Sequence, residues 1–179
     1  MDNVESNSPL QLEERGKEEY AKGNFAAAAD LFAGSAQAYA AAQDELKAAE
    51  MKNNQSVALL QGGRAQEALE ATDGTEAVFQ KAGDLKRQGI AVSNRAAALE
   101  ALKKADEALS EYERAAALLE QAGEGDMHSL VRKTAANLNL KRGRITAAQM
   151  DVYDSLRLVE KPSFTQRVLK FFRRIGFIK

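Results

Sequence analysis

An internal period of 40 residues is the feature of this chain that most restricts its fold. Four alanines lie at this spacing, and the residues before each of them repeat in type, over Gly23–Ala28, Gly63–Ala68, Lys103–Ala108 and Gly143–Ala148. A repeat of this length is typical of helical solenoids, in which each unit buries its apolar face only against its neighbours. The period therefore directs the search for function toward a binding groove and away from an active site.

The composition favours helices along the whole chain. Of the 179 residues, 45% are hydrophobic but only 6% are aromatic, and alanine, the best helix former, supplies the difference. Alternating runs of β-branched residues, which are typical of strands, are missing. We therefore predict an all-α fold with a single core.

Several other classes of protein are disfavoured by the same composition. The chain has no cysteine, so it forms neither a disulfide nor a thiolate metal site. Its first nine residues are acidic and polar, unlike a secretory signal. No stretch approaches the roughly 18 consecutive apolar residues of a membrane-spanning helix. We expect a soluble, cytoplasmic protein.

Each 40-residue unit is predicted to form two antiparallel helices. The turns within units fall at 22–24, 62–64, 102–104 and 142–144, and three of them contain the glycine that suits a left-handed residue after a helix end. Lys103 takes this place in the third turn, which we expect to be either strained or built differently. The joints between units, at 42–44, 82–84 and 122–124, each end in an acidic residue suited to cap the next helix.

The apolar residues follow the same plan. In the second helix of the third unit they lie three and four apart from Ala105 to Leu119, and the first unit repeats this pattern from Phe25 to Ala36. We expect the alanines to let neighbouring helices approach closely, and the aromatic residues to fill the core beside them.

The segment from Arg15 to Phe32 resembles the tetratricopeptide repeat (TPR) family. It has the small residue, aromatic residues, turn glycine and central alanine of that repeat at Gly16, Tyr20, Gly23, Phe25, Ala28 and Phe32. Later units keep the central alanine but have Thr72 and Val152 at the place of Phe32. The usual period of the family is 34 residues, and a period of 40 resembles its longer-helix branch, which is found in kinesin light chains and many bacterial regulators. The resemblance covers roughly residues 10–160.

This resemblance implies a right-handed α-solenoid of four antiparallel helix pairs, whose concave face is lined mainly by the first helix of each pair. In the family this face binds an extended peptide or a partner helix. Polar residues that recur on the first helices are therefore the candidates for the groove, and they are Lys17, Asn53, Asn54, Gln61, Ser93, Asn94, Lys133, Asn137 and Lys141.

Asparagine is the most informative residue in this set. Its amide both donates and accepts hydrogen bonds, so Asn54 and Asn94 are suited to pair with the backbone of a bound peptide of any sequence. Asparagine is mildly unfavourable within a helix, so its recurrence calls for a reason. Two alternatives to peptide binding stay open: the amides tie one helix to the next, or they face water.

One subtype of the family is disfavoured. Its chaperone-binding members hold a C-terminal carboxylate with basic residues and asparagines on the first helices. Asn54 matches that pattern, but Glu13, Ile90 and Asn94 stand at neighbouring places where basic residues are needed. We do not expect a carboxylate clamp.

The C-terminal segment differs from the rest of the chain in charge. Residues 1–160 carry 19 basic and all 26 acidic side chains, a net charge of −7, whereas residues 161–179 carry six basic and no acidic side chains. Pro162 breaks the chain and Ser163 is suited to cap a new helix. Its apolar and basic side chains follow helical spacing, and they are Phe164, Arg167, Val168, Lys170, Phe171, Phe172, Arg173, Arg174, Ile175 and Ile178.

Three roles compete for this segment. A helix here could cap the exposed core of the last unit, as solenoids generally need. It could also lie on an anionic membrane as a basic amphipathic helix. The third role is docking on a partner or on the acidic body of the solenoid.

The residues that carry catalysis are missing from the pattern. The single histidine, His128, is expected on the surface, and no metal site or cofactor site is predicted. The glycines lie at helix joints and form no phosphate-binding loop, and no nucleophile stands in a known turn motif. Acid pairs such as Glu13–Glu14 are interpreted as solvated helix faces. The acidic body also disfavours nucleic acid as a partner.

We therefore predict a flexible N-terminus over residues 1–9, a TPR-like solenoid over 10–161 and a basic amphipathic helix over 162–179. The expected function is a non-catalytic scaffold or adaptor that binds a protein or peptide in its groove. One alternative is a peripheral membrane-associated assembly factor attached through the C-terminal helix. Another is a structural protein that self-assembles into homo-oligomers through its exposed end units.

Overall fold

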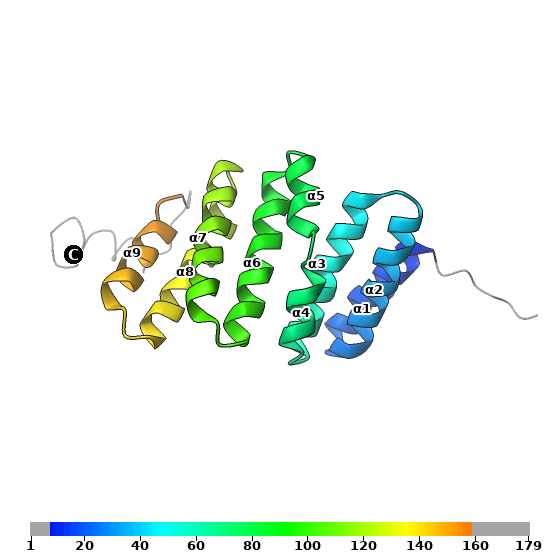
Figure 1. Cartoon of the computed structure of the whole chain (residues 1–179), viewed down its shortest axis with the longest axis horizontal. Coiled ribbons are helices and arrows are strands. Elements are labelled where there is room, and N and C mark those ends of the chain that lie inside the picture. The colour runs from blue at the N-terminus through cyan, green and yellow to red at the C-terminus, as the bar shows by residue number, and fades with distance from the viewer. Residues whose placement is uncertain (1–7, 159–179) are drawn as a thin grey trace, which may run out of the picture.

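The computed structural model describes residues 8–158, and within that range all regular secondary structure is helical. The helices follow one another along the long axis of the molecule (Figure 1). The first helices of the four units are α1 (Pro9–Ala21), α3 (Glu45–Gln61), α6 (Leu85–Ala101) and α8 (Gly125–Lys141). The second helices are α2 (Phe25–Ala41), α4 (Ala65–Ala71) with α5 (Thr75–Lys81), α7 (Ala105–Gln121) and α9 (Ile145–Ser155).

The helix boundaries repeat with the sequence. Each first helix ends 40 residues after the previous one, at Ala21, Gln61, Ala101 and Lys141, and each second helix begins four residues later. Helix α1 begins at Pro9, which lies within the stretch predicted to be flexible. Ser8 caps it, because its hydroxyl accepts the backbone N–H of Gln11 at 3.2 Å while the Gln11 side chain accepts the backbone N–H of Ser8 at 2.9 Å.

The turns within the units share one conformation, including the turn without glycine. Gly23, Gly63 and Gly143 have positive φ angles of 83°, 76° and 71°, and Lys103 has a φ of 64°. The third turn is therefore built like the others, with a lysine in the left-handed region that normally favours glycine.

Acidic residues cap two of the first helices, as predicted. The Asp44 carboxylate accepts the backbone N–H of Lys47 at 3.0 Å, and the Asp84 carboxylate accepts that of Arg87 at 2.8 Å. Glu124 stands at the same place before α8, but its side chain forms no capping hydrogen bond.

The second helix of the second unit is not continuous, which corrects the prediction of four unbroken helix pairs. Helix α4 ends at Ala71, and α5 begins at Thr75 after Gly74, which has a φ of 78°. The outer limits of the two short helices still match those of α2 and α7 in the repeat. Both also contact α3 and α6, so the break bends the helix path without removing it from the packing.

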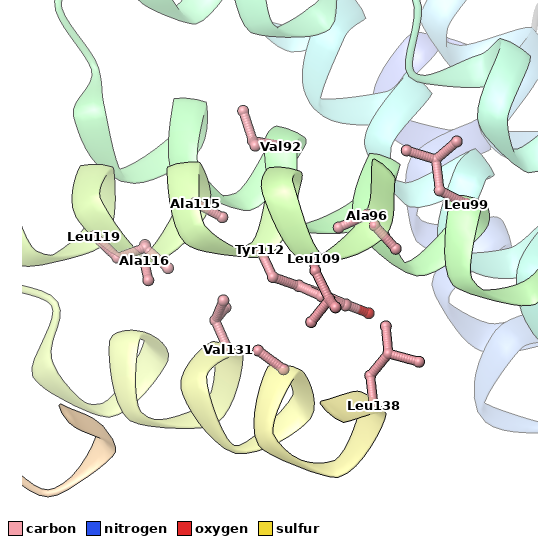
Figure 2. Close-up of a cluster of buried hydrophobic side chains, with 12 residues drawn as sticks. Val92, Ala96, Leu99, Leu109, Tyr112, Ala115, Ala116, Leu119, Val131 and Leu138 are labelled. Atoms are coloured by element: carbon pink, nitrogen blue, oxygen red, sulfur yellow. The ribbon is translucent and has the colours of Figure 1, made fainter. Parts of the chain in front are cut away.

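The core lies between consecutive helices. In the third and fourth units, Leu109 and Tyr112 of α7 extend toward Val131 and Leu138 of α8 (Figure 2). In the first unit, Gly16 lets Phe32 lie directly against α1, because a Cβ at Gly16 would come within 2.8 Å of the Phe32 ring. Small residues therefore set how closely the helices approach, as the alanine-rich pattern predicted.

Candidate functional site

Two hollows on the surface are lined mainly by the first helices. The smaller one has a volume of about 280 Å³ and lies between the first two units. Lys17 and Tyr20 of α1, Phe32 of α2, and Asn54 and Val57 of α3 line it. Phe32 is buried at its base, so the hollow combines an apolar floor with an ammonium group and a carboxamide. Such a mixture suits a peptide, which presents both apolar side chains and polar backbone groups.

Lys17 is held in this hollow by a buried acid. Its Nζ atom lies 2.7 Å from Glu13 Oε1 and 3.1 Å from Glu14 Oε1. Glu13 is only 3% exposed, which corrects the prediction that the Glu13–Glu14 pair forms a solvated face. The Tyr39 hydroxyl donates to Glu13 Oε2 at 3.0 Å, and Lys47 lies 3.6 Å from the same oxygen.

These contacts keep both members of the pair charged. Burial raises the pKa of Glu13. Hydrogen bonds from Lys17 and Tyr39 and the nearby charge of Lys47 together lower it by more, so the pKa lies below its ordinary value. The pKa of Lys17 is raised, chiefly by its hydrogen bond to Glu13. The hollow therefore contains a charged ammonium group that is paired with neighbouring carboxylates at neutral pH.

The larger hollow has a volume of about 500 Å³ and extends over the second, third and fourth units. It is lined by Leu60, Ala97, Glu100, Ala101, Lys103, Ala105, Leu138 and Lys141. Lys141 Nζ lies 3.4 Å from Glu100 Oε1, and the Tyr112 hydroxyl donates to Glu100 Oε2 at 3.1 Å. Burial raises the pKa of Tyr112, and the Glu100 charge adds to this effect. A charged pair thus stands beside an apolar surface here as well.

Three of the nine predicted groove residues, Lys17, Asn54 and Lys141, line these hollows. The other six line neither of them. Asn53 is buried, and its Oδ1 atom has no hydrogen-bond partner, while the Ser93 hydroxyl donates to the Ile90 carbonyl at 2.9 Å. Asn94 is half-buried, and the remaining residues, Gln61, Lys133 and Asn137, are exposed.

Residues at one repeat position line both hollows and were not among the predicted site residues. Tyr20 lies in the first hollow, and Leu60 and Glu100, at the same place in later units, lie in the second. Each stands one helical turn after Lys17, Val57 or Ala97. The signal that could have found them is the period itself, applied to apolar residues as well as polar ones.

One asparagine outside the predicted set ties two helices together. Asn139 of α8 donates to Asp151 Oδ2 of α9 at 2.9 Å, and Arg132 donates to Asp151 Oδ1 at 3.2 Å. Arg132 also lies 3.8 Å from a carboxylate oxygen of Asp154. An amide on a first helix therefore has a structural role at this position.

His128 is buried, which corrects its predicted place on the surface. It is fully inaccessible to solvent, and both of its ring nitrogens lack hydrogen-bond partners. Burial lowers the pKa of the imidazole, and the Arg132 charge lowers it further. Among residues 8–158, no three acidic or histidine side chains come together in a way that could hold a metal ion.

The predicted C-terminal amphipathic segment, from Phe164 to Ile178, lies outside the described residues. Within the described range, no helix combines the length and the apolar character needed to cross a bilayer.

Comparison with known proteins adds no family assignment. No protein-family model matches the chain, and no curated protein is detectably similar to it in sequence.

Proposed function

We propose that this chain is a TPR-like, right-handed α-solenoid that binds an extended peptide or a partner helix along the surface lined by its first helices. The chemistry would be recognition without catalysis, as in a scaffold or adaptor. The single observation that carries this proposal is the first hollow, where Lys17 and Asn54 come from successive first helices and line the same hollow beside apolar side chains.

The polar groups of the first hollow support a peptide that offers backbone carbonyl groups. Lys17 is about half exposed, and Glu13 and Glu14 use two of the three N–H donors of its ammonium, so one donor is left for a ligand. Asn54 is half-buried in the same hollow and has both a donor and an acceptor for a peptide backbone.

The second hollow supports a ligand that extends along the repeat. Leu60 of α3 lines it, as do residues of α6 and α8, so the two hollows share α3 as a wall. Every second side chain of an extended peptide lies on the same face. A peptide that lies along the repeat is therefore able to place side chains in both hollows.

Peptide selection against the full chain would test the proposal. A random peptide library is displayed and selected on the immobilised protein, and the dissociation constants of the selected peptides are measured by fluorescence anisotropy. We expect a Lys17→Ala, Asn54→Ala double variant to bind the peptides about tenfold or more weakly, because each charged or amide hydrogen bond contributes about 1–3 kcal/mol.

A matched double variant controls for general effects. Lys52 and Gln37 are exposed, and neither lines a hollow. The Lys52→Ala, Gln37→Ala variant is expected to bind like the wild type. Equal affinities for both double variants would rule out the first hollow as the binding site.

A further inference from the structure

The last unit leaves large apolar side chains uncovered. Leu130, Leu140 and Ile145 are 66%, 53% and 62% exposed, and all three belong to α8 or α9. The equivalent residues of the earlier units show what these places face when another unit follows.

The place of Leu140 faces the next unit across a shared hollow in the first two units. Tyr20, at this place in the first unit, shares a hollow with Val57 of α3. Leu60, at this place in the second unit, shares a hollow with Ala97 of α6. In both cases the partner is the same position on the first helix of the following unit.

The places of Ile145 and Leu130 also contact the next unit. Ala105, at the place of Ile145, shares a hollow with Leu138 of α8, and the Cβ of Phe25 in the first unit lies 3.6 Å from a Cβ built at Gly62. Glu50, at the place of Leu130, lies 3.7 Å from Arg87 of α6.

A fourth exposed side chain, Met150, serves as an internal comparison. It is 59% exposed, but Asp30, Glu70 and Ser110, at the same place in earlier units, are exposed too. Exposure at this place is therefore a property of every unit. Leu130 is no more informative, because Leu10, at the same place in the first unit, is 57% exposed although α3 follows it. At the places of Leu140 and Ile145, by contrast, the equivalent residues of all earlier units are half-buried.

The remaining sequence continues the repeat at the required place. Helices α3, α6 and α8 begin at Glu45, Leu85 and Gly125, so the next first helix falls at residue 165. Six places are buried in both α6 and α8, and apolar or small residues stand at five of them, namely Val168, Leu169, Phe171, Gly176 and Ile178, while the sixth is occupied by Lys179.

The small residue in this set falls at a repeat position where every earlier unit also has a small residue. Gly176 takes the place of Gly16, Ser56, Ala96 and Ala136, all of which are small and buried. The basic residues Arg167, Lys170, Arg173 and Arg174 fall at places that are exposed or half-buried in α6 and α8. The apolar residues and these four basic residues therefore fit the repeat, and Lys179 is the exception.

The end of the described chain is compatible with this register. Helix α9 ends early at Ser155, but the α4–α5 pair shows that a broken second helix keeps the register of the repeat. After α9 the chain lies against the beginning of α8, because a Cβ at Gly125 would be 2.5 Å from the carbonyl oxygen of Leu158. Pro162 takes the place of Ala42, Ala82 and Ala122, each of which donates its backbone N–H to the carbonyl four residues earlier. Proline has no N–H for this bond, so the second helix of the fourth unit has to end before this place, as α9 does at Ser155.

We propose that residues 165–179 form the first helix of a fifth unit, which packs on α8 and α9 and covers Leu140 and Ile145. The 40-residue repeat thus continues past Pro162. This role is independent of what binds in the hollows.

Cysteine crosslinking tests the register directly, because the natural chain has no cysteine. The Leu140→Cys, Phe177→Cys variant places thiols at the positions of the Tyr20–Val57 and Leu60–Ala97 pairs. The control is Met150→Cys, Phe177→Cys, whose two sites are closer in sequence. Oxidation of the purified full chain is followed by mass spectrometry, and circular dichroism checks that both variants are helical.

We expect an intramolecular disulfide in the first variant, formed at least tenfold faster than in the control. Equal rates in the two variants would show that the segment does not dock in this register. Disulfides between two chains would assign the exposed face to a second copy. Binding of the wild type to phosphatidylserine vesicles, with no crosslink in the first variant, would assign the segment to a membrane. Each of the last three results overturns the proposal.

Discussion

The Ser56 hydroxyl of α3 donates a hydrogen bond of 2.7 Å to the backbone carbonyl of Ala68 in α4. In an unbroken helix this carbonyl would accept the backbone N–H of Thr72, but that N–H bonds to the Leu69 carbonyl at 3.1 Å instead. Ser56 therefore satisfies the carbonyl that the break in the second helix leaves free.

Replacing Ser56 by alanine should destabilise the protein. The buried Ala68 carbonyl would lose its partner, and we expect the free energy of unfolding to fall by about 1–3 kcal/mol. Alanine itself fits, because Ala96 and Ala136 occupy the same place in later units. Urea denaturation measures the effect, and Ser110→Ala on the exposed side of α7 is the control. Equal stability of Ser56→Ala and the wild type would show that the hydroxyl does not support the break.

Gly16→Ala should destabilise the protein even though alanine is the better helix former. Its Cβ would lie 2.8 Å from the Phe32 ring, and overpacking of this kind costs about 1–3 kcal/mol. At Gly34 a Cβ would lie 3.6 Å from Leu12, an ordinary contact, so Gly34→Ala should stabilise by up to about 1 kcal/mol. Thermal unfolding of the two variants compares them directly. The same sign of change in both would contradict the packing at Gly16.

Replacing Lys103 by glycine should stabilise the third turn. Lys103 has a φ of 64°, and glycine adopts this conformation without the steric cost of a Cβ. We expect a gain of about 1 kcal/mol in the free energy of unfolding. The neighbouring Lys104 has a φ of −85°, so Lys104→Gly should give no such gain. A loss of stability in Lys103→Gly would argue against the left-handed turn.

The stability of the protein should fall between pH 7 and pH 5.5 because of His128. Its folded-state pKa lies below the ordinary value of 6.5, so the unfolded chain binds the proton more readily. The contribution of the neutral imidazole is therefore complete above pH 6.5 and is lost as the pH falls toward the folded-state pKa.

His128→Leu should remove this pH dependence, and because neither ring nitrogen has a partner, it should cost little at pH 7. The chain has no other histidine, and the lowered pKa of Glu13 acts only at more acidic pH. Urea midpoints at pH 7 and 5.5 provide the comparison. A variant with the same pH dependence as the wild type would exclude His128 as its source.

Most helix boundaries could be predicted because they depend on local chemistry. Glycine at Gly23, Gly63 and Gly143 and acids at Asp44 and Asp84 act within one turn of the helix end. The break between α4 and α5 was not predicted, although Asp73-Gly74 is a dipeptide typical of turns. The alignment with the second helices of the other units favours an unbroken helix, and the break is also supported by Ser56, a residue on a different helix.

The candidate site shows the same division. Lys17, Asn54 and Lys141 could be picked out because the period assigns them to the first helices, which the TPR resemblance implies line the groove. The burial of Glu13 and His128 could not be predicted, because it depends on neighbouring helices. Glu13 is kept inside by Tyr39, Lys17 and Lys47, of which only Lys17 is close in sequence.

The most direct test of the proposed groove observes the Asn54 side chain itself. Two-dimensional ¹H–¹⁵N NMR spectra of the full chain would follow its carboxamide N–H signals during titration with a selected peptide. We predict that these signals shift and saturate at the dissociation constant measured by anisotropy. Those of Asn24, which donates to Glu19 in the first turn at 2.7 Å, should not move. Saturable binding that leaves the Asn54 signals unchanged would contradict the account.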